Sequence, residues 1–139
     1  MRFQNLEAAE WAVVRPYSPG LFGVSRHADG GVVSRDAPAH PGEVIFIFGT
    51  GFGPTRPPMH TGELAPPAPV WLDGKAEAKI GEAMLAPDDI LYGGLAPGFA
   101  GVYQFNLRIP AAAPSGDLEV MVKVGDDWSQ AGVKIPVTR

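Results

Sequence analysis

The sequence contains no cysteine, few charged residues, no cluster of basic residues and no long apolar run. Without cysteine the chain can form no disulfide framework and carry out no thiolate chemistry. Only 19% of the residues are charged and the net charge is −4, which makes nucleic acid and anionic membrane surfaces poor partners. No apolar run approaches the ~18 residues of a membrane span, so we expect no membrane insertion. Residues 1–5 also lack the apolar core of a signal peptide.

What the chain does have is glycine, proline and enough apolar residues for a core. It has 139 residues, of which 45% are hydrophobic, 18 are glycine and 15 are proline. This length suits one domain with a single core, and so much glycine and proline indicates many turns between short strands. We therefore expect one domain over residues 1–139, in which residues 1–15 form a lead-in segment.

The organising stretch is an apolar strand that runs into a glycine-rich corner. Residues 44–48 (Val-Ile-Phe-Ile-Phe) are apolar throughout, which is typical of a strand buried on both faces. Gly49, Gly51 and Gly53 follow, and glycine suits positive φ or the close approach of another segment. We predict a structural corner here, in which Phe52 fills one end of the core.

Three later stretches alternate apolar and polar residues, as half-buried antiparallel strands do. They cover residues 102–109, 118–124 and 133–137, and Pro136 places the last one at a sheet edge. About seven or more short strands, spaced by ~10 residues, predict an all-β, immunoglobulin-like antiparallel β-sandwich. The residues predicted to be nearly fully buried are Phe46 or Phe48, Phe105, Leu107, Val120, Val122 and Ile135.

Two glycine-containing turns predict local hairpins. The turn at residues 29–31 would pair residues 24–27 with residues 32–34. Asp73 and Gly74 lie between two strand-like runs, which predicts a two-residue hairpin with Gly74 at positive φ. Residues 11–14 also read as a short strand.

The segment of residues 55–69 is a long, proline-stiffened loop, and long loops in compact domains are often functional. Its candidate binding residues are Arg56 and His60, together with Trp71 just beyond it. The plainer interpretation, which we favour, is that the loop only connects the two sheets. The tryptophans at positions 11, 71 and 128 are likewise expected to pack in the core or at its rim; two exposed, coplanar rings would favour glycan binding.

No constellation of residues predicts catalysis, a cofactor or a metal. The three histidines fall in predicted loops without metal-ligand spacing, and no serine has an evident histidine partner. The Gly-Thr-Gly-Phe-Gly corner lacks the helix and the acidic residue of a dinucleotide site. The acidic pairs at 88–89 and 126–127 lack the ligand ladder of an EF-hand, so calcium is only a minor alternative.

Four blocks of sequence, at residues 19–22 with 28–30, 41–54, 94–106 and 114–120, carry a family resemblance that spans the chain from about residue 16. Their order and spacing resemble the C-terminal domain of unknown function found in many secreted acidobacterial proteins, typified by Solibacter. They also look like a relative of the IPT/TIG immunoglobulin-like domains. The chain departs from that pattern at Arg26 and His27, where small or amide residues are expected.

The resemblance implies a secreted or cell-surface bacterial protein and no established activity. We therefore expect a non-catalytic structural or interaction module that contacts other domains of a longer parent protein or a surface partner. The alternative is a carbohydrate-binding module, with a glycan as its ligand.

Overall fold

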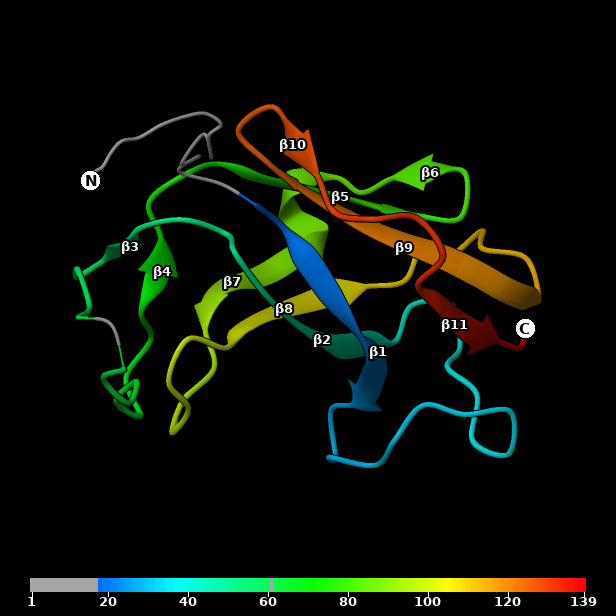
Figure 1. Cartoon of the computed structure of the whole chain (residues 1–139). Helices are drawn as coiled ribbons and strands as arrows, with labels where there is room; N and C mark the ends of the chain where they lie inside the picture. Colours follow the sequence, from blue (N-terminus) through cyan, green and yellow to red (C-terminus); the bar gives the residue numbers. More distant parts are fainter. Residues whose placement is uncertain (1–17, 61) are drawn as a thin grey trace.

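The computed structural model describes residues 18–60 and 62–139, which form two antiparallel sheets packed face to face (Figure 1). This architecture confirms the predicted antiparallel β-sandwich. The larger sheet has the strand order β1-β2-β8-β7-β4-β3. Its strands are β1 (Gly20–His27), β2 (Val44–Thr50), β8 (Tyr103–Arg108), β7 (Ile90–Leu95), β4 (Trp71–Leu72) and β3 (Thr55–Arg56).

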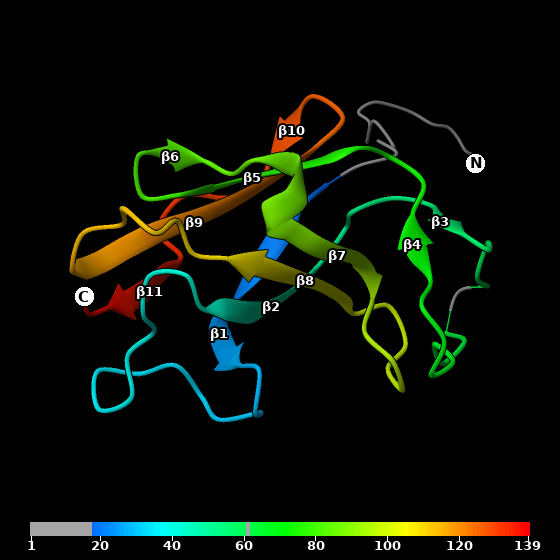
Figure 2. The ribbon, with the colours of Figure 1, turned by 180° about the vertical axis from the view of Figure 1, so that it is seen from behind.

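The second sheet is built around the longest strand, β9 (Gly116–Val124). On one side β9 pairs with β5 (Ala76–Ile80), which in turn pairs with β6 (Ala83–Met84). On the other side, β10 (Asp127–Trp128) and β11 (Lys134–Val137) pair with its two ends. A short 3-10 helix, η1 (Pro87–Asp89), leads from β6 into β7 (Figure 2).

Strand β2 buries only one of its two faces. Ile45 and Ile47 are 0% and 2% exposed, whereas Phe46 and Phe48 lie on the opposite face and are half-buried. The prediction that Phe46 or Phe48 is a core residue, in a strand buried on both sides, was therefore wrong. The run is apolar at every position, so it carries no alternation that marks the inward face. The other predicted core residues are buried as expected: Phe105, Leu107, Val120, Val122 and Ile135.

Asp73 and Gly74 do not form a hairpin, and Gly74 does not adopt positive φ. Strand β4 before them pairs with β3 and β7, whereas β5 after them pairs with β6 and β9 in the other sheet. The Asp-Gly pair therefore lies in a connection that crosses between the layers. An Asp-Gly pair suits many sharp turns, and the local sequence does not tell which strand each run pairs with.

The turn after β1 forms as predicted. The His27 N–H donates to the Gly31 carbonyl at 2.8 Å, and Gly30 has φ +94°. The chain then pairs back through the Val33 N–H and the Ser25 carbonyl, 2.9 Å apart. The predicted strand at residues 11–14 and the lead-in segment lie outside the described residues.

β11 lies at a sheet edge, in keeping with its proline. Beyond it the described chain makes only a parallel bridge from Ala39 to Val137, and the Pro136 carbonyl accepts from the Ala39 N–H at 2.9 Å. Proline lacks an N–H, so a strand paired along the Ala39 side of β11 would have one carbonyl without a donor at Pro136.

The glycine corner lets the start of β1 approach β2 closely. The Ser18 N–H donates to the Gly51 carbonyl at 2.8 Å. A Cβ atom at Gly49 would lie 2.3 Å from the Gly20 carbonyl oxygen, and one at Gly51 would lie 2.0 Å from that of Ser18. Only glycine fits such contacts.

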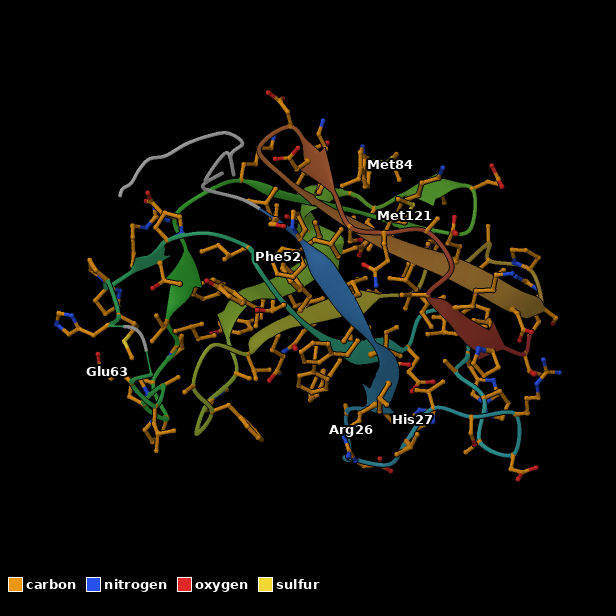
Figure 3. All side chains as sticks on the ribbon, in the orientation of Figure 1. Arg26, His27, Phe52, Glu63, Met84 and Met121 are labelled. Carbon is orange, nitrogen blue, oxygen red and sulfur yellow. The ribbon has the colours of Figure 1, made fainter. Side chains whose placement is uncertain are left out.

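Phe52 projects from this corner into the space between the sheets (Figure 3) and is 0% exposed. Its ring meets those of Phe105 and Tyr103 edge to face, with centroids 4.7 and 5.6 Å apart. Edge-to-face packing adds to the stabilisation that burial alone gives.

The proline-rich loop has a small core of its own beside the main one. Ala65, Val70 and Leu95 are buried together, with Met59 and Tyr103 packed against them. Ala65 also holds the loop to the segment after β7, because its N–H donates to the Phe99 carbonyl at 2.9 Å and its carbonyl accepts from the Gly98 N–H at 2.8 Å. The loop is thus fixed against β4 and β7.

Candidate functional site

An exposed tryptophan and an ion pair share the outer face of strands β3 and β4. Arg56 lies directly opposite Trp71 in the β3–β4 ladder, so the two side chains point to the same side. Asp73 follows two positions after Trp71, and Leu72 between them points into the core. The Arg56 Nη1 and Asp73 Oδ1 atoms are 3.2 Å apart, with both side chains more than half exposed. We call Arg56, Trp71 and Asp73 the platform.

The Trp71 side chain is backed by a fixed aromatic ring. Trp71 is 46% exposed, and its indole packs edge to face with Tyr92, with centroids 4.9 Å apart. The Tyr92 hydroxyl lies 2.8 Å from the Leu95 carbonyl and 3.1 Å from the Val70 carbonyl, and it accepts from the Val70 N–H at 3.3 Å. Burial raises the pKa of Tyr92, so the hydroxyl keeps its proton. The phenol is therefore held in one position behind the indole.

Gly94 makes room for this arrangement. It pairs with Trp71 across the β4–β7 ladder. A Cβ atom at Gly94 would lie 2.0 Å from the Val70 carbonyl oxygen and 2.7 Å from the Tyr92 hydroxyl. A side chain there would displace the tyrosine that supports Trp71.

An open groove of about 550 Å³ adjoins the platform. It lies between the proline-rich loop and the glycine corner, and Arg56 and Asp73 belong to its wall. Further along, the wall is formed by Pro58, Met59, His60, Glu63 and Tyr103. The hydroxyl of Tyr103 donates to the Gly53 carbonyl at 2.5 Å, and burial raises its pKa. The charged residues of this wall are Arg56, Glu63 and Asp73, which sum to −1 when His60 is neutral.

The structure brings two of the three predicted binding residues into this groove. Arg56 and His60 line it, whereas Trp71 lies beside it on the outer face of the sheet. Asp73 and Tyr92 are not among the predicted binding residues. Asp73 lies in a pair that predicts a hairpin turn, and Tyr92 supports Trp71 through the pairing of β4 with β7, which are distant in sequence. Whether Arg56, His60 and Trp71 bind a ligand stays a prediction.

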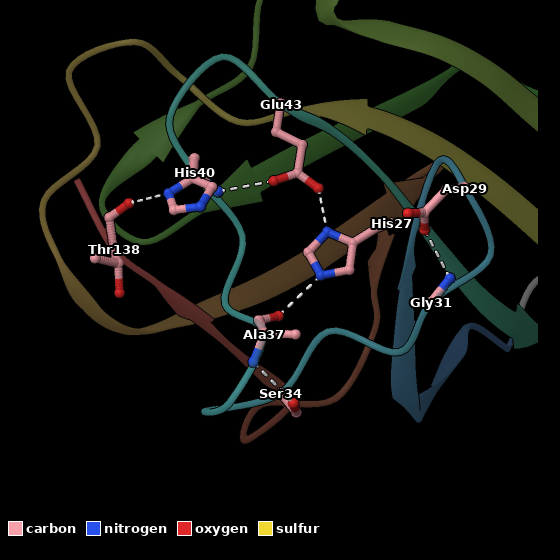
Figure 4. A network of polar contacts seen from close by, with 8 residues as sticks. All are labelled: His27, Asp29, Gly31, Ser34, Ala37, His40, Glu43 and Thr138. Carbon is pink, nitrogen blue, oxygen red and sulfur yellow. Dashed lines mark hydrogen bonds and ion pairs between the residues drawn. The ribbon is translucent and has the colours of Figure 1, made fainter.

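A second polar cluster surrounds His27, the last residue of β1 (Figure 4). The His27 Nδ1 donates to the Glu43 carboxylate, and its Nε2 lies 2.8 Å from the Ala37 carbonyl oxygen. The other oxygen of Glu43 accepts from the His40 N–H at 2.9 Å, and the His40 Nδ1 lies 2.6 Å from the Thr138 carbonyl. The hydrogen bond to Glu43 is the largest cause of a raised pKa of His27, and the Ala37 carbonyl adds to it.

This histidine cluster joins segments that are distant along the chain. It connects the end of β1, the connector before β2 and the residue after β11. Both ring nitrogens of His27 face oxygen acceptors, so the ring makes both hydrogen bonds as a donor only when it is protonated. The arrangement holds the connector in place.

A short turn motif, His-x-Gly-Glu, occurs twice in the chain. His40 and Glu43, and again His60 and Glu63, enclose a glycine at positive φ, Gly42 or Gly62. In each case the glutamate carboxylate accepts a hydrogen bond from the backbone N–H of the histidine, at 2.9 Å for His40 and 3.0 Å for His60. Each histidine is therefore the first residue of a turn, and the side chain of the fourth residue, a glutamate, binds its backbone N–H.

The outer face of the six-stranded sheet carries an apolar area over β1 and β2. Phe46 and Phe48 are half-buried there, and Phe22 and Val24 are 44% and 50% exposed. Residues 22–24 oppose the single residue Phe48, which makes a β-bulge in β1. We call Phe22, Val24, Phe46 and Phe48 the apolar face.

The outer face of the other sheet differs in character. Glu77 lies opposite Lys123, and Lys79 lies opposite Met121. Lys123 also lies over the Trp128 ring, with its Nζ 5.8 Å from the ring centroid. Charged side chains alternate with apolar ones on this sheet, and Met84 and Met121 lie on the far side of the molecule from Arg26 (Figure 3).

Two of the remaining candidates from the sequence have structural partners. The Ser129 Oγ accepts from the Val122 N–H at 2.9 Å, and Asp89 pairs with Arg108 at 3.6 Å. Within residues 18–60 and 62–139, no group of three or more metal-ligating side chains comes together. No helix in this part of the chain is long and apolar enough to cross a membrane.

Comparison with known proteins adds no relative. No protein-family model matches the chain, and no curated protein or solved structure matches it either. The resemblance to the acidobacterial secreted domain therefore remains a prediction from the sequence.

Proposed function

We propose that the chain is a non-catalytic interaction module of a secreted or cell-surface bacterial protein. The observation that supports this most is the apolar face on β1 and β2. Its four residues are half-buried or exposed although the strand pattern of β2 is that of a strand covered on both sides. Contiguous exposed apolar patches on soluble proteins commonly mark interaction sites.

The partner that suits this face is another protein surface, either a neighbouring domain of a longer parent protein or a separate surface protein. The two sheets of the sandwich differ in this respect. The outer face of β5 and β9 has charged residues facing one another across the ladder, as a solvated sheet does. Aromatic residues and arginine are enriched in interfaces, and Arg26 lies directly opposite Phe46 on this face.

The absence of cysteine gives a direct test. Val24→Cys and Lys79→Cys each introduce a single thiol, one on the apolar face and one on the outer face of the other sheet. We expect an alkylating reagent to modify Val24→Cys at least tenfold more slowly in the complete protein, as made by its own bacterium, than in the isolated chain. Lys79→Cys should react at the same rate in both. Equal rates for Val24→Cys in the two settings would refute a covered apolar face.

The second candidate function is a carbohydrate-binding module, and the platform favours it. An exposed indole beside a groove whose wall carries a few charged side chains is the kind of surface that presents an apolar contact and hydrogen-bonding groups together. A glycan array probed with the complete chain tests this function, and a calcium titration by calorimetry on the same sample tests the minor alternative of a calcium site.

A further inference from the structure

We propose that Arg56, Trp71 and Asp73 form the subsite of a neutral saccharide, with a sugar ring stacked on the indole and its hydroxyls bound by the ion pair. This inference rests on the second candidate function, carbohydrate binding. It names the residues, the ligand class and the charge of the ligand.

The indole is preorganised for stacking. Tyr92 is held by three hydrogen-bonding distances of 2.8 to 3.3 Å at its hydroxyl, and it packs edge to face with Trp71. The face of an aromatic ring is negative, and it attracts the weakly positive C–H groups on one side of a sugar ring. A ring that is already fixed loses little freedom when the ligand binds.

The ion pair supplies what sugar hydroxyls need. A guanidinium has five donors and a carboxylate only acceptors, whereas a hydroxyl is both donor and acceptor. The Arg56 and Asp73 side chains are 67% and 53% exposed, so both keep free hydrogen-bonding positions beside the indole. Adjacent hydroxyls of one sugar can therefore bind one group each.

The charge of the site selects among sugars. The ion pair is neutral as a unit, and Glu63 makes the groove wall negative. An acidic sugar would meet this negative charge and would have to compete with Asp73 for Arg56. A neutral sugar is not repelled by the wall and does not compete with Asp73. The groove next to the platform has room for a second sugar unit of an oligosaccharide.

The test compares matched tryptophans. A neutral oligosaccharide selected on the glycan array is titrated calorimetrically into the wild-type chain, Trp71→Ala and Trp128→Ala. Trp128 is a suitable control because it is 38% exposed and lies on the other sheet. We expect Trp71→Ala to weaken binding at least tenfold and Trp128→Ala to leave it unchanged. Arg56→Gln and Asp73→Asn should each weaken binding about three- to tenfold, and thermal unfolding shows that each variant is folded.

The outcomes separate this inference from the function on which it rests. If no sugar binds the wild-type chain, carbohydrate binding itself is wrong, and the interaction module is unaffected. If a sugar binds with equal affinity to the wild type and Trp71→Ala, the function stands and the subsite is wrong. Preference for an acidic over a neutral sugar would refute the charge argument. Binding of a proline-rich peptide that is lost in Trp71→Ala, with a silent array, would replace the saccharide by a peptide.

Discussion

The side-chain amide of Gln130 pairs with the backbone of Leu21 as a neighbouring strand would. The Leu21 N–H donates to Gln130 Oε1 at 3.0 Å, and Gln130 Nε2 donates to the Leu21 carbonyl at 2.8 Å. Leu21 lies on β1, at an edge of the six-stranded sheet, whereas Gln130 follows β10 in the other sheet. One side chain thus covers an exposed strand edge and connects the two layers.

Gln130→Ala should therefore destabilise the chain by about 1–3 kcal/mol, because two backbone groups lose their partners. It should also promote self-association through the edge of β1, since uncovered edges pair with other chains. Urea denaturation and gel filtration measure the two effects. Gln104→Ala is the control, because its side-chain amide donates to the Asn106 side chain on the outer face and bonds to no strand edge among the described residues. Equal stability of Gln130→Ala and the wild type would show that the bridge is dispensable.

Replacing a phenylalanine on the core side of the larger sheet should cost more stability than replacing one on its outer face. Phe105 is 0% exposed, so Phe105→Ala should cost about 3–5 kcal/mol. Phe48→Ala should cost only about 1 kcal/mol, since Phe48 is half-buried. Chemical denaturation of both variants checks this. Similar losses would mean that both faces of β2 are buried in the isolated chain.

The glycine corner provides a test of close approach. Gly51→Ala adds a Cβ atom 2.0 Å from the Ser18 carbonyl oxygen at a φ of +80°. Gly30→Ala adds one at φ +94°, with no atom of the described residues within 4 Å. Both variants bear the cost of a positive φ, about 1 kcal/mol, but Gly51→Ala should lose clearly more free energy of unfolding. Equal losses would show that the segment at Ser18 moves aside freely.

The same corner should bind no phosphate. Phosphate-binding glycine loops aim the amides of a helix N-terminus at the anion, and here Pro54 and the two-residue strand β3 follow instead. Titration with ATP, NAD and inorganic phosphate, followed by NMR of the amides of residues 49–53, should give no saturable shift. Saturable shifts at submillimolar ligand would overturn this and reopen the question of an enzyme.

The stability of the chain should depend on the protonation of His27. The pKa of His27 is raised in the folded state by Glu43 and Ala37, above the 6.5 of an unperturbed histidine. The stabilisation is then complete below about pH 6.5 and is lost as pH rises through the folded-state pKa. The nearby charged groups are Glu43 and Asp29, and both favour the protonated form.

We expect the free energy of unfolding of the wild type to fall between pH 6 and pH 9 more than that of His27→Gln. NMR titration of the His27 ring gives the pKa directly. A pKa at or below 6.5 would contradict the donor roles assigned to both ring nitrogens.

The alternating strands could be predicted because the inward face of each is visible in its own sequence. In β8 and β9, polar residues separate the apolar ones, so the sequence shows which residues face the core. The run at β2 lacks this alternation, and the inward choice of Ile45 and Ile47 depends on neighbouring strands. The corner could likewise be recognised from its glycines, since backbone geometry is a local property.

The parts that escaped prediction depend on contacts between distant segments. Nothing near Asp73 indicates that the chain leaves one sheet for the other there. Tyr92, which supports Trp71, lies 21 positions after it in the sequence. Gln130, which pairs with Leu21, lies 109 positions after it. The length of their loop predicts Arg56 and His60 as binding residues, but the groove that they line is completed by the glycine corner and by Tyr103, which lie elsewhere in the sequence.

The order of strands in the larger sheet has a consequence for avidity. The apolar face lies on β1 and β2 and the platform on β4 and β3, so the nearest strands of the two surfaces, β2 and β4, are three strand spacings apart in one continuous sheet. At about 4.8 Å per spacing these two strands are roughly 14 Å apart, so, if both proposals hold, a protein partner and a saccharide would bind at separate places on the same sheet. The sheet would then act as a short, stiff linker between two weak attachments, and a surface that offers both ligands would be held far more tightly than one that offers either.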